Sequence, residues 1–248
     1  GDRFYPSIAV SGEGVPAGRR FALFPLAQDL PSDVKITVVA VDHAGNRTER
    51  TPQINIKDRA YPNESIVLSQ RFLDQKIADL AGATGVNDSD KLKAFQEINT
   101  RIRKENEEKI RSAIAESAPE PLFTEAFEQM PDSQVRSAFA ERRSYMLDGQ
   151  KVSESIHYGY DLASLAGAPI PASNKGRVVF ADELGIYGNC VIVDHGLGLH
   201  SLYGHLSNID VKTGDAVEKG QTLGQSGQTG LAGGDHLHFA ILLRGVYV

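Results

Sequence analysis

Hydrophobic and polar positions follow three different patterns along this chain of 248 residues. In the first zone, residues 1–68, every second residue from Val34 to Val38 is apolar, and this period of two predicts a β-strand. A run of turn-forming residues at 42–46 separates this stretch from a second alternating stretch around Ile54. We therefore expect a small β-sandwich in this zone.

The second zone, residues 69–148, has the period of a helix. Apolar residues recur at steps of three and four from Leu92 to Ile102, which predicts an amphipathic helix with one buried face. Asp88 or Ser89 is placed to cap the beginning of this helix. Prolines end the pattern downstream, and the apolar spacing after them predicts further short helices.

The third zone, residues 149–248, consists of short apolar stretches bounded by glycines. Sixteen of the 24 glycines and six of the seven histidines lie between His157 and Val248. Frequent turn signals between short strands predict an all-β domain of antiparallel sheets. The expected fold class is thus multi-domain α+β, in which a β-sandwich and a helical region precede a C-terminal all-β domain.

Composition and charge narrow the classes of function. Apolar residues make up 41% and charged residues 23% of the chain, as in globular proteins. A net charge of −6 without a Lys/Arg cluster argues against a nucleic-acid or anionic-membrane binder. No apolar run approaches the roughly 20 residues that span a bilayer. Because the sequence begins with Gly1 and has no signal peptide, we expect a targeting or anchoring segment to lie outside it.

The single cysteine, Cys190, excludes an intramolecular disulfide. Its apolar neighbours indicate a buried strand position, where free cysteines are common. A thiol nucleophile is the alternative, and no residue near Cys190 in the sequence supports it.

Two short segments combine histidine and carboxylate side chains with a period of two. On an extended strand, His157, Gly159 and Asp161 share one face, with a glycine gap between imidazole and carboxylate. His236 and His238 also share a face, whereas the apolar residues beside them fill the other. We therefore expect the apolar face of each strand to pack against the core and the other face to line a site.

These residue types suit zinc, which is commonly held by three protein ligands with water in the fourth position. Two neutral imidazoles and one carboxylate satisfy that count. Either segment alone is a weak signal, but both occur within one domain together with a further histidine, His205.

The C-terminal zone resembles the lysostaphin-type (LytM-like) zinc metallopeptidases of bacterial peptidoglycan, over less than half of the chain. The matching segments are 157–161, 176–178, 203–207, 211–221, 223–230 and 236–239. Upstream, Phe139 to Arg142 resembles a Phe-Gly-x-Arg element, with Ala140 in place of the glycine. The first two zones more loosely resemble the extra domains of envelope-anchored members.

The resemblance implies that His157, Asp161 and His238 bind zinc, and that His205 and His236 handle protons. The implied activity is hydrolysis of peptide cross-links in peptidoglycan by a metal-activated water. The sequence has no His-Glu-x-x-His helix, so the thermolysin arrangement with a glutamate base is absent. Which of the two proton-handling histidines is the base stays open.

Other residues near these motifs have two interpretations. Tyr145 and Arg142 either contact the substrate or are ordinary packing and surface residues, and Tyr203 either lines the cleft or packs in the core. The glycines around His195 indicate a structural histidine in a turn. We expect His200 to face solvent, because it lies on the opposite strand parity from the motif residues.

Two alternatives to an enzyme remain open. The first is a non-enzymatic cell-wall scaffold or activator of other wall hydrolases, for which missing ligands would be expected. The second is a lipoyl-carrier or phosphocarrier domain, because the pattern at 214–221 also occurs in those domains. A lipoyl carrier needs an exposed lysine on a tight hairpin, and a phosphocarrier has no need for Asp161.

The expected domain organisation and partners follow from the resemblance. Residues 1–68 would form the small β domain, residues 69–148 a helical linker, and residues 149–248 the zinc peptidase domain. The partners would be peptidoglycan stem peptides, without nucleic acid, in a cell envelope location (periplasm or cell surface) with a membrane tether. An autoinhibitory contact from residues 69–148 is a further hypothesis, and the scissile bond is either a D-Ala–diaminopimelate link or a glycine bridge.

Overall fold

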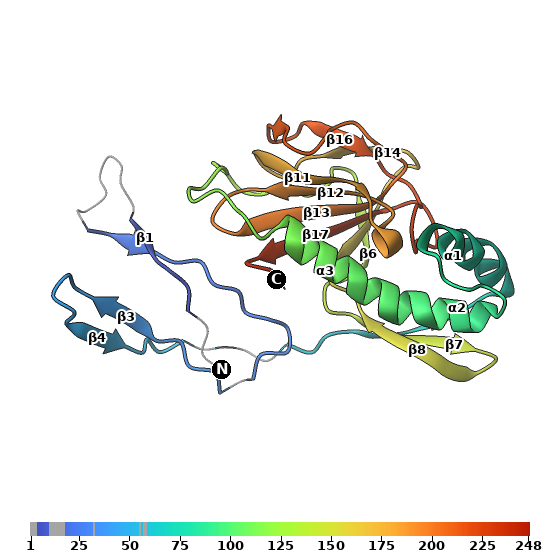
Figure 1. Ribbon diagram of the computed structural model, residues 1–248, viewed down its shortest axis with the longest axis horizontal. Helices are drawn as coiled ribbons and strands as arrows, with labels where there is room; N and C mark the ends of the chain where they lie inside the picture. The colour runs from blue at the N-terminus through green and yellow to red at the C-terminus, as the bar shows by residue number, and fades with distance from the viewer. Residues whose placement is uncertain (1–3, 10–17, 32, 55, 57–58) are drawn as a thin grey trace.

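The computed structural model describes residues 4–9, 18–31, 33–54, 56 and 59–248. Figure 1 shows a body of stacked sheets formed by the C-terminal half of the chain, with a helical layer packed alongside. The N-terminal segment extends away from this body.

Four short strands of the N-terminal segment form two separate ribbons, β1 (Ile8–Ala9) with β2 (Arg20–Phe21) and β3 (Val38–Val41) with β4 (Arg47–Arg50). Asp42 closes the second turn, because its Oδ1 accepts hydrogen bonds from the amides of Ala44 (2.9 Å) and Asn46 (2.8 Å). Two strands flank this turn, as predicted, but they lie closer to it than the alternation indicates, because residues 34–37 and 51–54 are not in strands. The expected β-sandwich does not form among the described residues, since β4 is exposed throughout and the buried apolar core begins at Leu68.

The helical layer contains η1 (Phe72–Ile77, π-helical), α1 (Ala78–Thr84), α2 (Lys91–Glu97), η2 (Ile98–Ile102, π-helical) and α3 (Arg103–Ala113). The predicted amphipathic helix is confirmed: Phe95, Ile98 and Ile102 are buried and Leu92 is half-buried. Its cap is Asp90 instead of Asp88 or Ser89, because Asp90 has extended backbone angles and its side chain accepts a hydrogen bond from the Lys93 amide (3.1 Å). In the described part of the chain, every helix is too short or too polar to span a bilayer.

The further short helices expected after the prolines are wrong, because residues 115–133 contain no helix. Backbone hydrogen bonds to the sheet body hold this segment extended, including Leu122 N to the His195 carbonyl (2.8 Å) and Leu197 N to the Ala118 carbonyl (2.7 Å). The segment leads into β6 (Gln134–Ser137), β7 (Arg142–Leu147) and β8 (Gln150–Ile156). β7 pairs antiparallel with β8 and parallel with β5 (Asn63–Val67).

The largest sheet has eight strands, and all of its pairings are antiparallel, as predicted. Its order is β15 (Ala216–Val217), β11 (Gly176–Glu183), β12 (Asn189–Asp194), β13 (Leu199–Leu206), β17 (Leu237–Leu243), β9 (Tyr160–Ala163) and β6, with β18 (Val246–Tyr247) paired to β17. A smaller sheet follows the order β10 (Pro169–Pro171), β16 (Thr222–Gln225), β14 (Asn208–Ile209), and a 3-10 turn, η3 (Gly185–Tyr187), precedes β12.

Both faces of the large sheet are buried, which produces three layers. One face packs against the helices, where Ile98 and Ile110 join Ile192 of β12 in a single apolar cluster. The opposite face packs against the smaller sheet in a second cluster that includes Val191. Cys190 lies on the helical side, fully buried as expected, and burial raises the pKa of its thiol. The helices and the sheet therefore share one hydrophobic core.

We predict that Ile98→Ala lowers the free energy of unfolding by about 2–5 kcal/mol, because it leaves a cavity between helix and sheet. Ile98 is fully buried, so Val38→Ala, at a position that is 58% exposed, is the matched control. Urea denaturation followed by circular dichroism measures both. Two transitions, with the β-sheet transition unmoved in Ile98→Ala, would contradict a shared core.

Candidate metal centre

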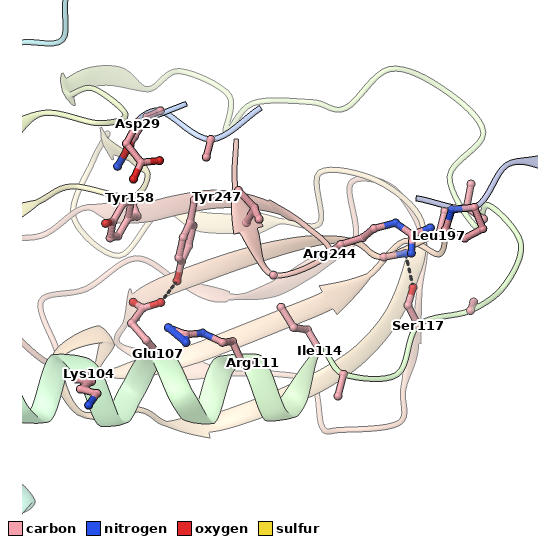
Figure 2. A pocket seen from close by; sticks show the side chains of 18 of the residues that line it. Asp29, Lys104, Glu107, Arg111, Ile114, Ser117, Tyr158, Leu197, Arg244 and Tyr247 are labelled. Atoms are coloured by element: carbon pink, nitrogen blue, oxygen red, sulfur yellow. Dashed lines mark hydrogen bonds between the residues drawn. The ribbon is translucent and has the colours of Figure 1, made fainter. Parts of the chain in front are cut away.

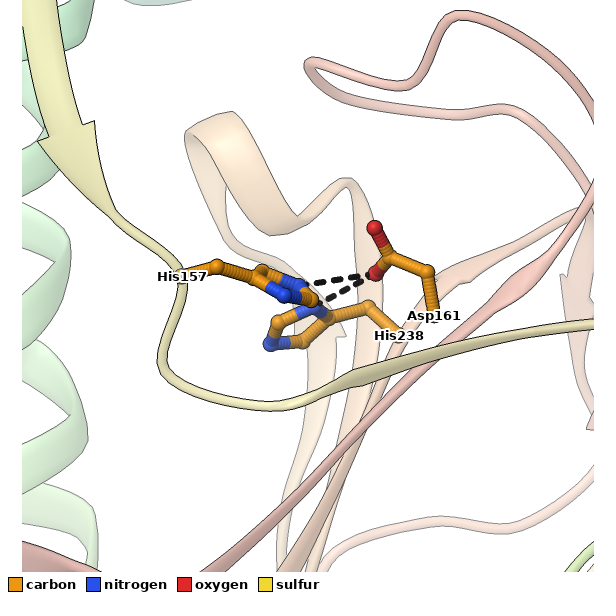
Figure 3. A group of neighbouring side chains, drawn as sticks. All are labelled: His157, Asp161 and His238. Atoms are coloured by element: carbon orange, nitrogen blue, oxygen red, sulfur yellow. Dashed lines mark hydrogen bonds and ion pairs between the residues drawn. The ribbon is translucent and has the colours of Figure 1, made fainter. Parts of the chain in front are cut away.

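Three side chains from separate strands and loops converge on one point, as Figure 3 shows. The Nε2 atom of His157 lies 2.9 Å from Oδ1 of Asp161 and 3.0 Å from Nδ1 of His238. The same Nδ1 lies 3.1 Å from Asp161 Oδ1. The structure therefore brings together the three residues for which the sequence predicts a common site.

The pairing of β9 with β17 sets this geometry. Asp161 and His238 are direct partners in the antiparallel register, so their side chains leave the sheet on the same face. His157 follows β8 and lies in the connection to β9, instead of on one continuous strand with Asp161 as the period of two predicts. A loop reaches the same convergence because it turns the imidazole back over β9.

Gly159 makes this turn possible. A Cβ atom at this position would lie 2.5 Å from the Phe239 carbonyl oxygen and 2.8 Å from two atoms of the His238 ring. The glycine between His157 and Asp161 thus allows the loop to cross directly over His238.

The three converging atoms are suited to a metal ion. The Ala138 carbonyl accepts a hydrogen bond from Nδ1 of His157 (3.1 Å), which leaves the lone pair of Nε2 directed at the other two residues. Two imidazole nitrogens and a carboxylate oxygen about 3 Å apart repel one another unless a cation or proton lies between them. Tetrahedral ligands about 2.0–2.1 Å from zinc are roughly 3.3 Å apart, close to the separations found here.

The pKa of the Asp161 carboxyl group is controlled by the side chains around it. Burial alone would raise its pKa, but the adjacent imidazoles of His157, His236 and His238 hold the pKa of this carboxyl far below its usual range. The guanidinium of Arg143 also donates to Asp161 Oδ2 (2.8 Å). Asp161 is therefore the negatively charged member of the group.

His205 and His236 lie beside these three residues. Their ring centres are 4.8 Å apart, and the His205 ring is 5.9 Å from that of His238. His205 belongs to β13, where alternation would place it on the other face. Its positive φ of 68° turns it towards the site instead.

Each of these two imidazoles has one nitrogen committed to a backbone carbonyl. Nδ1 of His205 donates to Thr229 (2.8 Å), and Nδ1 of His236 donates to Gly234 (2.8 Å). Burial and the neighbouring histidines lower the pKa of His205 well below its usual value. Burial also acts to lower the pKa of His236, but Asp161 raises it above the usual value. Nε2 is thus the second nitrogen of each ring, and that of His236 lies 3.5 Å from Asp161 Oδ1.

A cavity of about 410 Å³ opens over the site. Its walls include residues that the sequence analysis did not single out: Glu64, Val67, Phe72, Arg143, Tyr187 and Leu231. Tyr145 also lines it, and its hydroxyl lies 3.1 Å from the Ser155 hydroxyl.

Arg142 is exposed and does not line this cavity, whereas its neighbour Arg143 does. The two residues alternate along β7, so only one of them points inwards. The structure therefore places Arg143, and not Arg142, in the wall of the cavity.

Tyr203 does not line the cleft, which was one of its two interpretations, but packs in the core. It pairs with Phe239 in the register, next to the Gly204–His238 pair, so its side chain leaves the opposite face of the sheet from His238. It is 1% exposed, and its hydroxyl accepts a hydrogen bond from the Ser173 amide (2.8 Å). This environment leaves Tyr203 no route to a substrate.

His195 and His200 are both fully buried. His195 is structural, as expected, and its ring bonds the Ser201 hydroxyl (2.7 Å) and the Lys175 carbonyl (2.8 Å). The expectation that His200 faces solvent is wrong, because helices and loops cover that face of the sheet. Its Nε2 lies 3.4 Å from Asp194 Oδ1.

A larger cavity of about 1250 Å³ lies between α3, the β17–β18 turn and the N-terminal segment (Figure 2). There Tyr158 and Tyr247 stack with ring centres 4.9 Å apart, and the Tyr247 hydroxyl donates to Glu107 (2.9 Å). This cavity contains none of the site residues for which the sequence predicts a role. The larger of the two cavities is therefore not the one that holds the candidate metal centre.

The family model for peptidase family M23 matches residues 155–248. The chain carries a peptidase family M23 domain. The peptidoglycan DD-endopeptidase ShyA of Vibrio cholerae is 39% identical over 123 residues, which are 48% of this chain and 28% of that protein. Lysostaphin of Staphylococcus staphylolyticus is 39% identical over 90 residues, 36% of this chain and 19% of that protein.

This chain spans about a quarter of the length of the curated relatives it matches. A crystal structure described as an M23 peptidase from Pseudomonas aeruginosa covers 99% of this chain, which in turn covers 83% of that chain. The TM-score is 0.60 at 23% identity. Similarity at this level extends the shared fold beyond the M23 domain to the preceding helical region.

We predict that Gly159→Ala destabilises the M23 domain by about 1–3 kcal/mol, because its methyl group must displace His238 or the β17 backbone. Gly233→Ala is the control, since Gly233 lines the same cavity and a Cβ there meets nothing within 4 Å. Thermal unfolding of the metal-free proteins measures the effect. Equal melting temperatures for the two variants would contradict the close approach.

Proposed function

We propose that this chain is a zinc metallopeptidase that hydrolyses peptide cross-links of bacterial peptidoglycan in the cell envelope. The observation that carries the proposal is the convergence of His157, Asp161 and His238 within an M23 domain. The names of its relatives, peptidoglycan DD-endopeptidase and lysostaphin, support a wall peptide as substrate.

In this proposal, His157 Nε2, Asp161 Oδ1 and His238 Nδ1 hold the zinc. When bound, zinc supplies a Lewis acid that polarises the scissile carbonyl and activates a water molecule. His205 and His236 take up and return protons through Nε2, because Nδ1 of each ring is held by a carbonyl. The walls of the cavity orient the peptide chain over these four imidazoles and the carboxylate.

The scaffold alternative is less well supported. A domain that only binds other proteins does not need metal-binding side chains. All five candidate residues are nevertheless present, and they lie in one pocket. A carrier domain is also disfavoured, because it offers no reason for Asp161 to lie between three histidines.

We predict that the two classes of histidine separate on mutation. His238→Ala and Asp161→Ala should lose bound zinc and activity, whereas His236→Ala and His205→Ala should keep about one zinc per chain. Activity of the latter pair should still fall about 10²–10⁴-fold, because a positioned acid or base contributes that much. Metal analysis and digestion of purified peptidoglycan, with mass analysis of the fragments, measure both properties.

His236 and His238 are two residues apart on one face, so misfolding would affect both variants alike. Zinc loss in His236→Ala with retention in His238→Ala would reverse the assignment. A wild-type protein that binds zinc but releases no fragments from cross-linked walls would support the scaffold alternative. Fragment masses distinguish a D-Ala–diaminopimelate link from a glycine bridge.

We also propose that the helical region restrains the cleft. Ser69 and Phe72 line the cavity, and Nζ of Lys76 donates to the Gln228 carbonyl at 2.5 Å. Gln228 belongs to the loop between β16 and β17 that also supplies Leu231 and Gly233 to the cavity wall. The half-buried lysine therefore ties a helix to the rim of the site, and burial lowers its pKa.

We predict that Lys76→Ala raises the rate of wall hydrolysis by up to about 10–150-fold, because a hydrogen bond to a charged group contributes about 1.5–3 kcal/mol to the restrained state. Lys93→Ala is the control, since that side chain is 80% exposed. Initial rates on labelled peptidoglycan measure the effect. An unchanged or lower rate in Lys76→Ala would reject the restraint and leave the enzyme assignment intact.

A further inference from the structure

The guanidinium of Arg143 lies between two carboxylates at the edge of the metal centre. Its Nη2 donates to Asp161 Oδ2 (2.8 Å), and its Nε donates to Glu141 Oε1 (2.9 Å). All three side chains are largely buried, with exposed fractions of 18% for Arg143, 14% for Asp161 and 7% for Glu141. Ion pairs at this depth are screened much less than surface pairs, and their geometry is fixed.

The two oxygens of Asp161 have different partners. Oδ1 faces the ring nitrogens of His157 and His238, whereas Oδ2 is bound by Arg143. A carboxylate that rotates about its own axis would exchange these oxygens or present both of them. The hydrogen bond from Arg143 removes this freedom and leaves Oδ1 directed at the two histidines.

Arg143 is itself held in place. Glu141 receives a hydrogen bond from Ser137 Oγ (3.2 Å) in addition to that from Arg143. The backbone carbonyl of Glu141 accepts a hydrogen bond from the His157 amide (2.9 Å). One short segment therefore fixes both the arginine that orients Asp161 and the backbone of His157.

We propose that Arg143 is a positioning residue that presents Asp161 Oδ1 to the zinc ion, and this inference rests on the zinc site of the proposed function. Groups that hydrogen-bond metal ligands commonly contribute 10–100-fold to metal affinity. The role needs a planar fork with two separately directed N–H groups, which lysine does not have.

Recognition of a substrate carboxylate is the competing role for an arginine in this cavity. The charge of Arg143 is already matched by Glu141 and Asp161, and Nε and Nη2 are both committed to these carboxylates. A substrate carboxylate would have to displace one of these two buried ion pairs to reach Nε or Nη2. The geometry thus favours a role towards Asp161 over one towards substrate.

The test compares Arg143→Met and Arg143→Lys with Arg142→Met in the full chain. Arg142 is the matched control, because it is the adjacent residue on the same strand and is exposed. Competition with a chelator gives the zinc dissociation constant, and thermal unfolding of the metal-free proteins gives their stability. A purely structural role would change the melting temperature but not the relative zinc affinity of the folded protein.

We expect Arg143→Met to raise the zinc dissociation constant about 10–100-fold, Arg143→Lys to raise it less, and Arg142→Met to leave it unchanged. If Arg143→Met does not fold, Arg143→Lys carries the test, and parental zinc affinity in that variant overturns the proposal. Parental affinity in both Arg143 variants with a raised KM for wall peptides would assign the residue to substrate instead. Failure of the parent protein to bind zinc would refute the proposed function itself, which distinguishes the two failures.

Discussion

The antiparallel register between β9 and β17 is the constraint on which the site depends. It makes Asp161 and His238 direct neighbours on one face of the sheet, and this proximity does not depend on the loop that carries His157. A shift of one residue would send either side chain to the opposite, apolar face. The loop that carries His157 can then complete the group only because Gly159 lets it pass within contact distance of His238. The sheet register and the absence of a side chain at position 159 together bring His157, Asp161 and His238 into one group.

The register is in turn stabilised by burial on both faces of the sheet. Leu237 and Phe239, which flank His238, pack into the cluster beneath the smaller sheet, whereas Ala240 and Leu242 pack on the helical side. Since Ile98 and Ile110 belong to that same helical cluster, the helices are part of the core that supports the M23 sheet. The composition of the sequence predicts a domain boundary near residue 149. The packing does not change at that residue, because the helices before it share a hydrophobic core with the sheet after it. β6, from before that point, is the last strand of the large sheet.

The sequence was most informative where local period and chemistry coincide. The alternation around His238 and the glycines of the C-terminal zone predicted antiparallel strands and a shared site, and the period of Leu92 to Ile102 predicted a buried helix. Prediction from the sequence failed where contacts between residues far apart in the chain determine the structure. His200 is buried because another layer covers its face, and residues 115–133 are extended because their amides and carbonyls bond to the sheet body. His205 reaches the site through a positive φ that strand alternation cannot reveal. Arg143 lines the cavity and Arg142 does not, because only one face of β7 points inwards. The motif does not indicate which of the two adjacent residues lies on that face.

Charge balance connects these features to the chemistry of the site. With neutral imidazoles, the buried group of Asp161, Glu141 and Arg143 carries one net negative charge, and an uncompensated buried charge is costly. A divalent cation bound by Asp161 would reverse that sign to one net positive charge. The site would then be suited to a reaction in which negative charge develops on a carbonyl oxygen. Without Arg143 the group would carry two negative charges, and bound zinc would leave it neutral. Arg143 would therefore orient Asp161 and also offset the charge of one of the two buried carboxylates.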